Sequence, residues 1–88
     1  LGEFDRDLGA AWFIPREVIK KKTRKGKDFY IVRAIDNTSK SSTIKVWGVD
    51  PKTDIIHVNR PYMAKRLDYS EQWGFSTRSM KYNWKIIA

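Results

Sequence analysis

The sequence predicts an all-β fold from three observations. Several short segments are rich in aromatic and β-branched residues, turn-forming residues separate them, and no segment keeps a helical periodicity over about ten residues. Five such segments in a chain of 88 residues favour a small barrel or a sandwich. A closed barrel also removes the exposed sheet edges that so short a chain could not otherwise cover.

The first strands follow a polar start. Residues 1–9 are polar and acidic and contain two glycines, so we expect a tether there and one folded domain over 10–88. A first strand begins near Phe13. The second, Phe29–Ile35, is aromatic and β-branched. The third, Thr43–Val49, alternates in polarity and ends at an Asp-Pro pair.

The second half of the chain is less regular. Ile55–Val58 is a short apolar stretch stopped by a proline turn, and Tyr62–Tyr69 fits either a helical turn or a strand. Asp68–Phe75 is expected to be the loop before the last strand. That strand, Met80–Ile86, alternates strictly and places three side chains in the core: Met80, Tyr82 and Trp84.

The net charge indicates a polyanionic partner. Eighteen Lys and Arg against ten Asp and Glu give +8. A membrane surface attracts the same charge, so the sign alone does not choose the partner. The longest apolar run, 10–14, is far too short to cross a bilayer, and we expect no membrane association.

Catalysis and metal binding are not expected. The chain has no cysteine, so a disulfide or a thiolate metal site is excluded, which fits a cytoplasmic protein. Its single histidine, His57, lies in an apolar run and is interpreted as structural, and no glycine-rich phosphate loop is present. We expect a monomeric domain that is not itself an enzyme and needs no cofactor. Because the chain begins without methionine and ends in an apolar run, we expect it to belong to a longer protein.

Alternation assigns the two faces of the central strands. Lys45 is costly to bury, so it is expected to face outward together with Trp47. Arg33 faces outward for the same reason and brings Phe29 and Ile31 with it. The inward set is then Tyr30, Val32, Ala34, Ile44 and Val46. Exposed aromatic rings among cations are what stacking on unpaired bases requires, although a neighbouring domain could cover the same surface.

Two further segments are candidates for nucleic-acid contact. A basic hairpin loop is expected between the first two strands, with Gly26 in its turn, and it would contact phosphates without reading sequence. Its candidate residues, beside Lys20, are Lys21, Lys22, Arg24, Lys25 and Lys27. Trp73, in the loop before the last strand, could clamp a base. The alternatives are a solubilising loop and a plug at the barrel end.

The stretch 14–49 resembles an OB-fold, a five-stranded Greek-key barrel. The resemblance is carried by Ile14, Val18, Lys-Lys-Thr-Arg-Lys-Gly-Lys at 21–27, the strand after it, Asp36 and Ile44-Lys45-Val46-Trp47. It is similar to the OB module of bacterial and phage DNA polymerase III α subunits, and in outline to the anticodon-binding domains of some aminoacyl-tRNA synthetases. Two glycines common in the family, in the first strand and after Asp36, are missing here.

The resemblance implies a function in nucleic-acid binding, with strands two and three as the surface. We expect single-stranded nucleic acid as the partner, DNA rather than RNA, within a replication protein of a bacterial or phage-infected cell. Two alternatives stay open. One is a structural module that docks on other domains of its parent protein, and the other is a tRNA-binding domain.

Overall fold

The computed structural model describes residues 9–36, 39–72, 74–81 and 83–87. Within these residues the chain forms seven strands and no helix, which confirms the all-β class and exceeds the five strands expected. The strands are β1 (Ala11–Lys22), β2 (Asp28–Ile35), β3 (Ser41–Val46), β4 (Tyr62–Ala64), β5 (Asp68–Ser70), β6 (Gly74–Thr77) and β7 (Trp84–Ile86).

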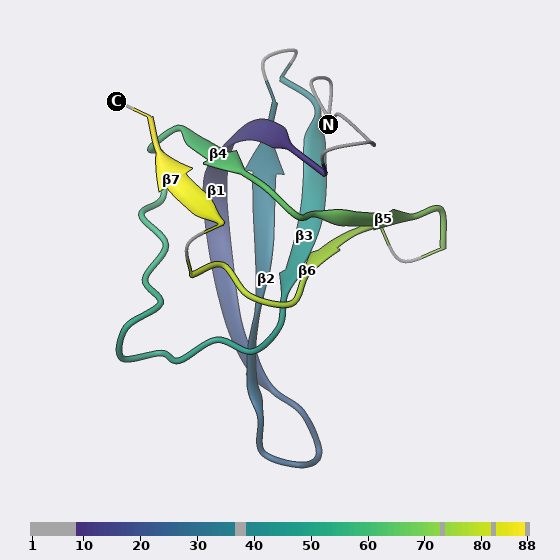
Figure 1. Ribbon diagram of the computed structural model, residues 1–88, viewed down its shortest axis with the longest axis vertical. Helices are drawn as coiled ribbons and strands as arrows, with labels where there is room; N and C mark the ends of the chain where they lie inside the picture. The colour runs from purple at the N-terminus through teal and green to yellow at the C-terminus, as the bar shows by residue number, and fades with distance from the viewer. Residues whose placement is uncertain (1–8, 37–38, 73, 82, 88) are drawn as a thin grey trace.

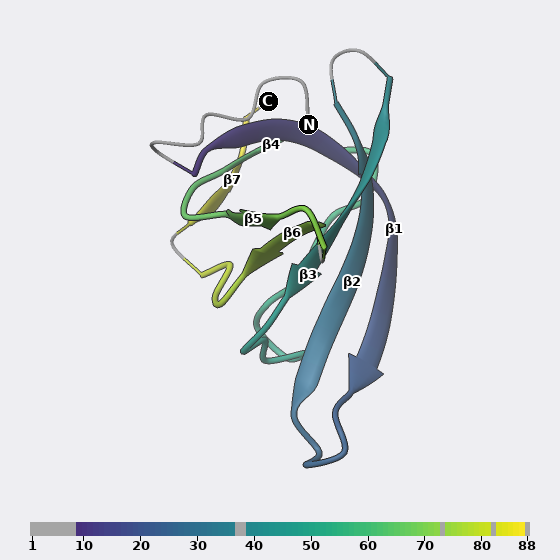
Figure 2. The same ribbon diagram turned by 90° about the vertical axis from the view of Figure 1, so that its right-hand side faces the viewer.

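The strands form one strongly curled sheet, a half-barrel, in the order β5-β6-β3-β2-β1-β4-β7. All neighbours are antiparallel except β3 and β6, which run parallel. Figure 2 shows the result: β1, β2 and β3 form one wall, and the short strands β4 to β7 curl over its inner side. The core lies between these two parts.

The bend that lets β1 serve both parts of the sheet is a β-bulge. Its first residues, 11–13, pair with β4, whereas residues from Ile14 onward pair with β2. The register shifts between Pro15 and Glu17, so Arg16 is the extra residue. A bulge bends its strand and increases the local twist. The chain therefore bends here without the glycine that the OB-fold resemblance implies.

The core confirms the face assignment of the central strands. Val32, Ile44 and Val46 are fully buried, and Trp84 is 8% exposed. Tyr82 lies outside the described residues. At the closed end of the core, Phe13 from β1 stacks on Tyr62 from β4, with ring centroids 6.2 Å apart. It also meets Trp84 from β7 edge to face at 5.0 Å. These three rings hold β1, β4 and β7 together.

The apolar stretch Ile55–Val58 forms no strand, and Ile55 and Val58 are exposed. Two expectations for the second half of the chain were wrong. The loop expected over Asp68–Phe75 contains β5 and the start of β6, which pair as a hairpin. The last strand covers only Trp84–Ile86, because a turn precedes it: the N–H groups of Asn83 and Trp84 both donate to the Met80 carbonyl at 3.0 Å.

The ambiguous segment Tyr62–Tyr69 contains strands and no helical turn. β4 and the first residues of β5 lie in it, and Arg66, with a φ of 57°, interrupts the extended chain between them. In the described part of the turn between β2 and β3, Ser39 has a positive φ of 63°. It supplies the left-handed conformation for which a glycine was expected. Asn37, the other candidate for that conformation, lies outside the described residues.

β3 ends at Val46, earlier than the predicted Val49, because the chain turns at Gly48. The φ of Gly48 is 65°, and an added Cβ would lie 2.7 Å from the Arg78 carbonyl oxygen. Both the conformation and the close approach require glycine. The turn leaves Trp47 at the rim of the sheet, where its backbone N–H donates to the Thr77 backbone carbonyl at 2.8 Å.

Two core tyrosines fasten the long loop between β3 and β4. The Tyr30 hydroxyl donates to the Asp54 carbonyl at 2.8 Å, and the Tyr62 hydroxyl accepts from the His57 N–H at 2.9 Å. Burial raises the pKa of Tyr30, and the negative charges of Asp54, Asp28 and Asp50 raise it further. Only the protonated hydroxyl can donate to Asp54, so ionisation removes this contact.

Tyr30→Phe is expected to be less stable than the wild-type protein at neutral pH, and this difference in the free energy of unfolding should disappear in strong alkali. A phenol whose pKa is higher in the folded than in the unfolded state contributes stability that is complete below the model value of 10.0 and is lost as the pH rises through the folded pKa. At pH 8 the variant should be less stable by about 0.5–1.5 kcal/mol, the value of a hydrogen bond. Urea denaturation from pH 8 upward should show this gap narrowing above pH 10.0. A gap that stays constant would contradict the assignment.

Candidate nucleic-acid interface

The outer face of β1, β2 and β3 is built from cross-strand rows, because residues directly opposite in a sheet share a face. The pairing of β2 with both neighbours gives four rows on this face: Ile14–Ile35–Ser41, Glu17–Arg33–Thr43, Ile19–Ile31–Lys45 and Lys21–Phe29. Ser76 of β6 extends the row of Ile31 beyond Lys45. The face therefore mixes apolar and cationic side chains, as the alternation predicted.

An aromatic stack occupies one end of this face. The rings of Phe29 and Trp47 lie 4.6 Å apart at an interplanar angle of 25°. Trp47 is 38% exposed, whereas Phe29 is half-buried. The backbone hydrogen bond to Thr77 anchors the main chain at Trp47, and the stack holds the indole against Phe29, so part of an oriented aromatic surface faces solvent.

The rest of the face is less exposed than predicted. Arg33 is exposed, but Ile31 and Lys45 are half-buried. Ile31 lies between Ile19 and Lys45 in its row, and Lys45 lies between Ile31 and Ser76. Each has a neighbouring strand on both sides, which covers part of its side chain. The alternation gives the correct face for Lys45, but the side chain is half-buried there and not exposed as expected.

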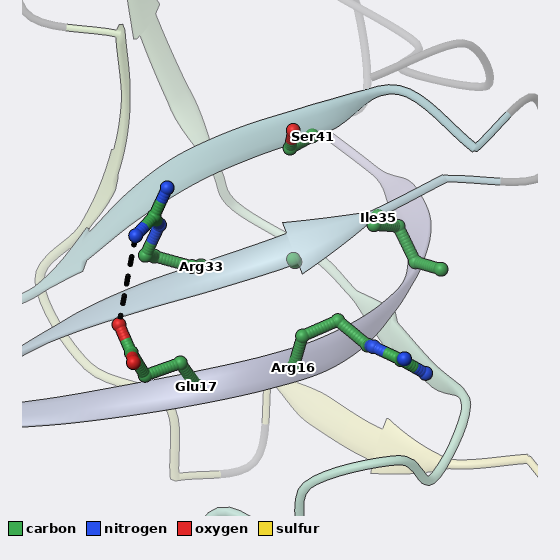
Figure 3. Close-up of a pocket in the computed structure, with 6 residues that line it drawn as sticks. Arg16, Glu17, Arg33, Ile35 and Ser41 are labelled. Atoms are coloured by element: carbon green, nitrogen blue, oxygen red, sulfur yellow. Dashed lines mark ion pairs between the residues drawn. The ribbon is translucent and has the colours of Figure 1, made fainter.

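Arg33 lies beside a shallow depression of about 340 Å³ at the bulge. Figure 3 shows Arg33 and Glu17 pointing toward each other, with a nitrogen and an oxygen 3.8 Å apart, and Arg16 pointing away from the pair. Both partners are more than half exposed, so the pair is worth at most about 1 kcal/mol. A phosphate can therefore compete for Arg33. Arg16 was not predicted here, because a bulge leaves no signal in the polarity pattern.

The basic segment is a projecting β-hairpin and not a loop throughout. Lys20, Lys21 and Lys22 belong to β1, and the turn spans only residues 23–27. Thr23 closes the turn: its N–H donates to the Lys27 carbonyl at 2.8 Å, and its Oγ1 accepts from the Lys27 N–H at 3.2 Å. Gly26 has a φ of 80°, as a turn glycine should. Figure 1 shows this hairpin, residues 20–28, extending beyond the other strands; we name it the arm.

The strand conformation divides the lysines of the arm between two faces. Lys21 lies opposite Phe29 and so belongs to the outer face. Lys20 and Lys22 lie opposite Tyr30 and Asp28 on the other face, and a depression of about 150 Å³ beside them is also lined by Lys21 and Pro51. The predicted site residues are thus not on one surface: Lys22 lies on the face away from Trp47.

Trp73 and His57 lie apart from the outer face and the arm in the sequence. Trp73 lies outside the described residues. The side chain of His57, which was interpreted as structural, is exposed, and the backbone N–H of His57 donates to the Tyr62 hydroxyl at 2.9 Å. Among the described residues no group of three or more acidic or histidine side chains could hold a metal ion.

The described part of the chain contains no helix long and apolar enough to cross a membrane.

The structure brings together an aromatic stack, Phe29 and Trp47, with Lys21 beside it. Arg33 lies further along the same face, and the arm lies next to the stack. No protein-family model, curated protein or solved structure matches this chain.

Proposed function

We propose that the curled sheet is a five-stranded barrel of the OB type with one additional strand. If β4 and β5 are counted as one strand interrupted at residues 65–67, the pairings run in a ring: β1 with β2, β2 with β3, β3 with β6, β6 with β5, and β4 with β1. β7 is then the addition, at the outer edge of β4. The parallel pairing of β3 and β6 supports this arrangement, because it joins the meander to the second half of the chain.

The function we propose is the binding of single-stranded nucleic acid on the outer face of β1, β2 and β3. The observation that carries it is the Phe29–Trp47 stack, whose indole is held against Phe29 and is 38% exposed. A base can stack on such a surface only when it is unpaired, because both faces of a base inside a duplex are covered by its neighbours. The aromatic stack therefore favours a single strand over a duplex.

The charges on the same face suit a sugar-phosphate backbone. Lys21 lies in the row of Phe29, and Arg33 lies further along β2. Among the described residues in the outer rows of these strands, Glu17 is the one acid, and it faces Arg33. A strand with one base on Trp47 would therefore meet positive charge near that base, at Lys21, and again further along the face, at Arg33.

The resemblance of residues 14–49 to the OB module of replicative polymerases supports single-stranded DNA as the ligand. In this proposal the domain holds the template strand and performs no catalysis of its own. A tRNA-binding role would use the same rings and cations, so DNA and RNA are compared directly in the test.

Titration of the 88-residue chain with fluorescent oligonucleotides tests the proposal. Single-stranded DNA, single-stranded RNA and blunt duplex DNA are compared by anisotropy at several salt concentrations. Single-stranded DNA should bind most tightly, and its affinity should fall by about 0.7 log units per log unit of salt for each phosphate contact. Tighter binding of the blunt duplex would contradict the stacking model, and no binding of any probe would favour a surface that docks on another protein domain.

A further inference from the structure

The arm carries most of the net charge of the protein. Its nine residues hold six cations and one acid, Asp28, a net +5 of the chain's +8. The cationic side chains are all exposed: Lys20, Lys21, Lys22, Arg24, Lys25 and Lys27. So concentrated a charge exceeds what one base-stacking site on the neighbouring face requires.

The arm is also basic on both of its faces. Lys21 points to the outer face, Lys20 and Lys22 point to the opposite one, and Arg24 and Lys25 lie in the turn. A strand lying flat on the outer face could reach Lys21 and the turn. It could not reach Lys20 and Lys22, which lie opposite Tyr30 and Asp28 on the other face.

The shape of the arm suits the groove of a duplex. Two antiparallel strands closed by a hydrogen-bonded turn form a ribbon, and the major groove of DNA, about 12 Å wide, admits a two-stranded β-ribbon. A ribbon that enters a groove tip first has one phosphate backbone beside each face. Cations on both faces then find a phosphate, which a single strand provides on one side only.

We propose that the protein binds at a junction between single- and double-stranded DNA, with the arm in the groove of the duplex and the emerging single strand on the outer face. This rests on the proposed single-strand site and adds a second one. The two sites are continuous, because Lys21 of the arm lies opposite Phe29, which stacks on Trp47. A strand that leaves the duplex at the arm therefore meets the aromatic stack at once.

The test compares three DNA probes of related sequence: a single strand, a blunt duplex, and a duplex with a single-stranded tail. The tailed probe should bind most tightly. Its salt dependence should be steeper than that of the single strand by about 0.9 log units for each duplex phosphate contacted. Lys20→Ala combined with Lys22→Ala should flatten the slope for the tailed probe by up to about 1.8 log units and leave the slope for the single strand unchanged.

The matched control removes two exposed lysines away from the arm, Lys65→Ala with Lys85→Ala. It carries the same change in net charge and should keep the preference for the tailed probe. Urea denaturation of both double variants verifies that each is folded.

Three results would overturn the inference. Equal affinity of the wild-type chain for the tailed probe and the single strand would mean that the arm does not hold a duplex, and the single-strand proposal would stand. If Lys20→Ala with Lys22→Ala flattened the salt dependence equally for the tailed probe and for the single strand, Lys20 and Lys22 would contact the single strand and not the duplex. Failure of every probe to bind would overturn both proposals together.

Discussion

Trp47→Ala is expected to weaken the binding of single-stranded DNA by about 5- to 150-fold. This range corresponds to the 1–3 kcal/mol that a base gains by stacking on an aromatic side chain. The substitution removes the exposed ring and leaves Lys21 and Arg33 in place, so the salt dependence of the remaining binding should change little. Anisotropy with a labelled single strand at two salt concentrations measures both quantities.

The same variant should remain folded, because Trp47 lies at the rim of the sheet. Its loss removes the stack on Phe29, which is worth about 0.5–1.5 kcal/mol beyond the area that it buries. A fully buried aromatic would cost about 3–5 kcal/mol. Trp47→Phe is the matched control, since it keeps a ring at the position and should keep most of the affinity. Unchanged affinity in a folded Trp47→Ala protein would show that bases do not use this ring.

Phe13→Ala is expected to have the largest effect on stability, about 3–5 kcal/mol. Phe13 has no exposed surface and contacts Tyr62 and Trp84. Its removal opens a cavity where β1, β4 and β7 meet. Small domains have only about 5–15 kcal/mol of total stability, so a large fraction would be lost.

Urea denaturation of Phe13→Ala beside Ile55→Ala measures this effect. Ile55 is an apolar residue of the long loop and is 59% exposed, so its truncation should change the stability by no more than about 0.5 kcal/mol. If both substitutions cost the same small amount, the three-ring cluster does not hold β1 to β4 and β7.

The outward set on β2 and β3 could be predicted from the sequence because one physical cost decides it. Burying Arg33 or Lys45 is so unfavourable that each fixes the orientation of its whole strand, and the buried Val32, Ile44 and Val46 follow. How deeply Lys45 lies among its neighbours depends on which strands flank it. The parallel pairing of β3 with β6 brings Ser76 beside it, and alternation within one strand cannot predict that pairing.

The arm and the second half of the chain could not be predicted for related reasons. Three consecutive lysines show no alternation of polarity, so nothing in the pattern assigned Lys20–Lys22 to a strand, yet the ladder with β2 extends through them. β5 and β6 are only three and four residues long. Strands so short are defined by their partners more than by their own sequence.

Two strand pairings between distant parts of the chain determine when the protein can acquire its final shape as it folds. The strands β1, β2 and β3 pair with their neighbours in the chain. The pairings of Ala11 with Ala64 and of Ile44 with Phe75, in contrast, join residues that are far apart in the sequence. Each of these closures costs loop entropy before its contacts repay it, which slows the folding of β-barrels into the range of milliseconds to seconds. Until both have formed, Phe13 and Ile44 remain in water on an open sheet. A sheet of β1, β2 and β3 alone would therefore expose apolar side chains that favour association, and the positive charge of the arm at its end would oppose it.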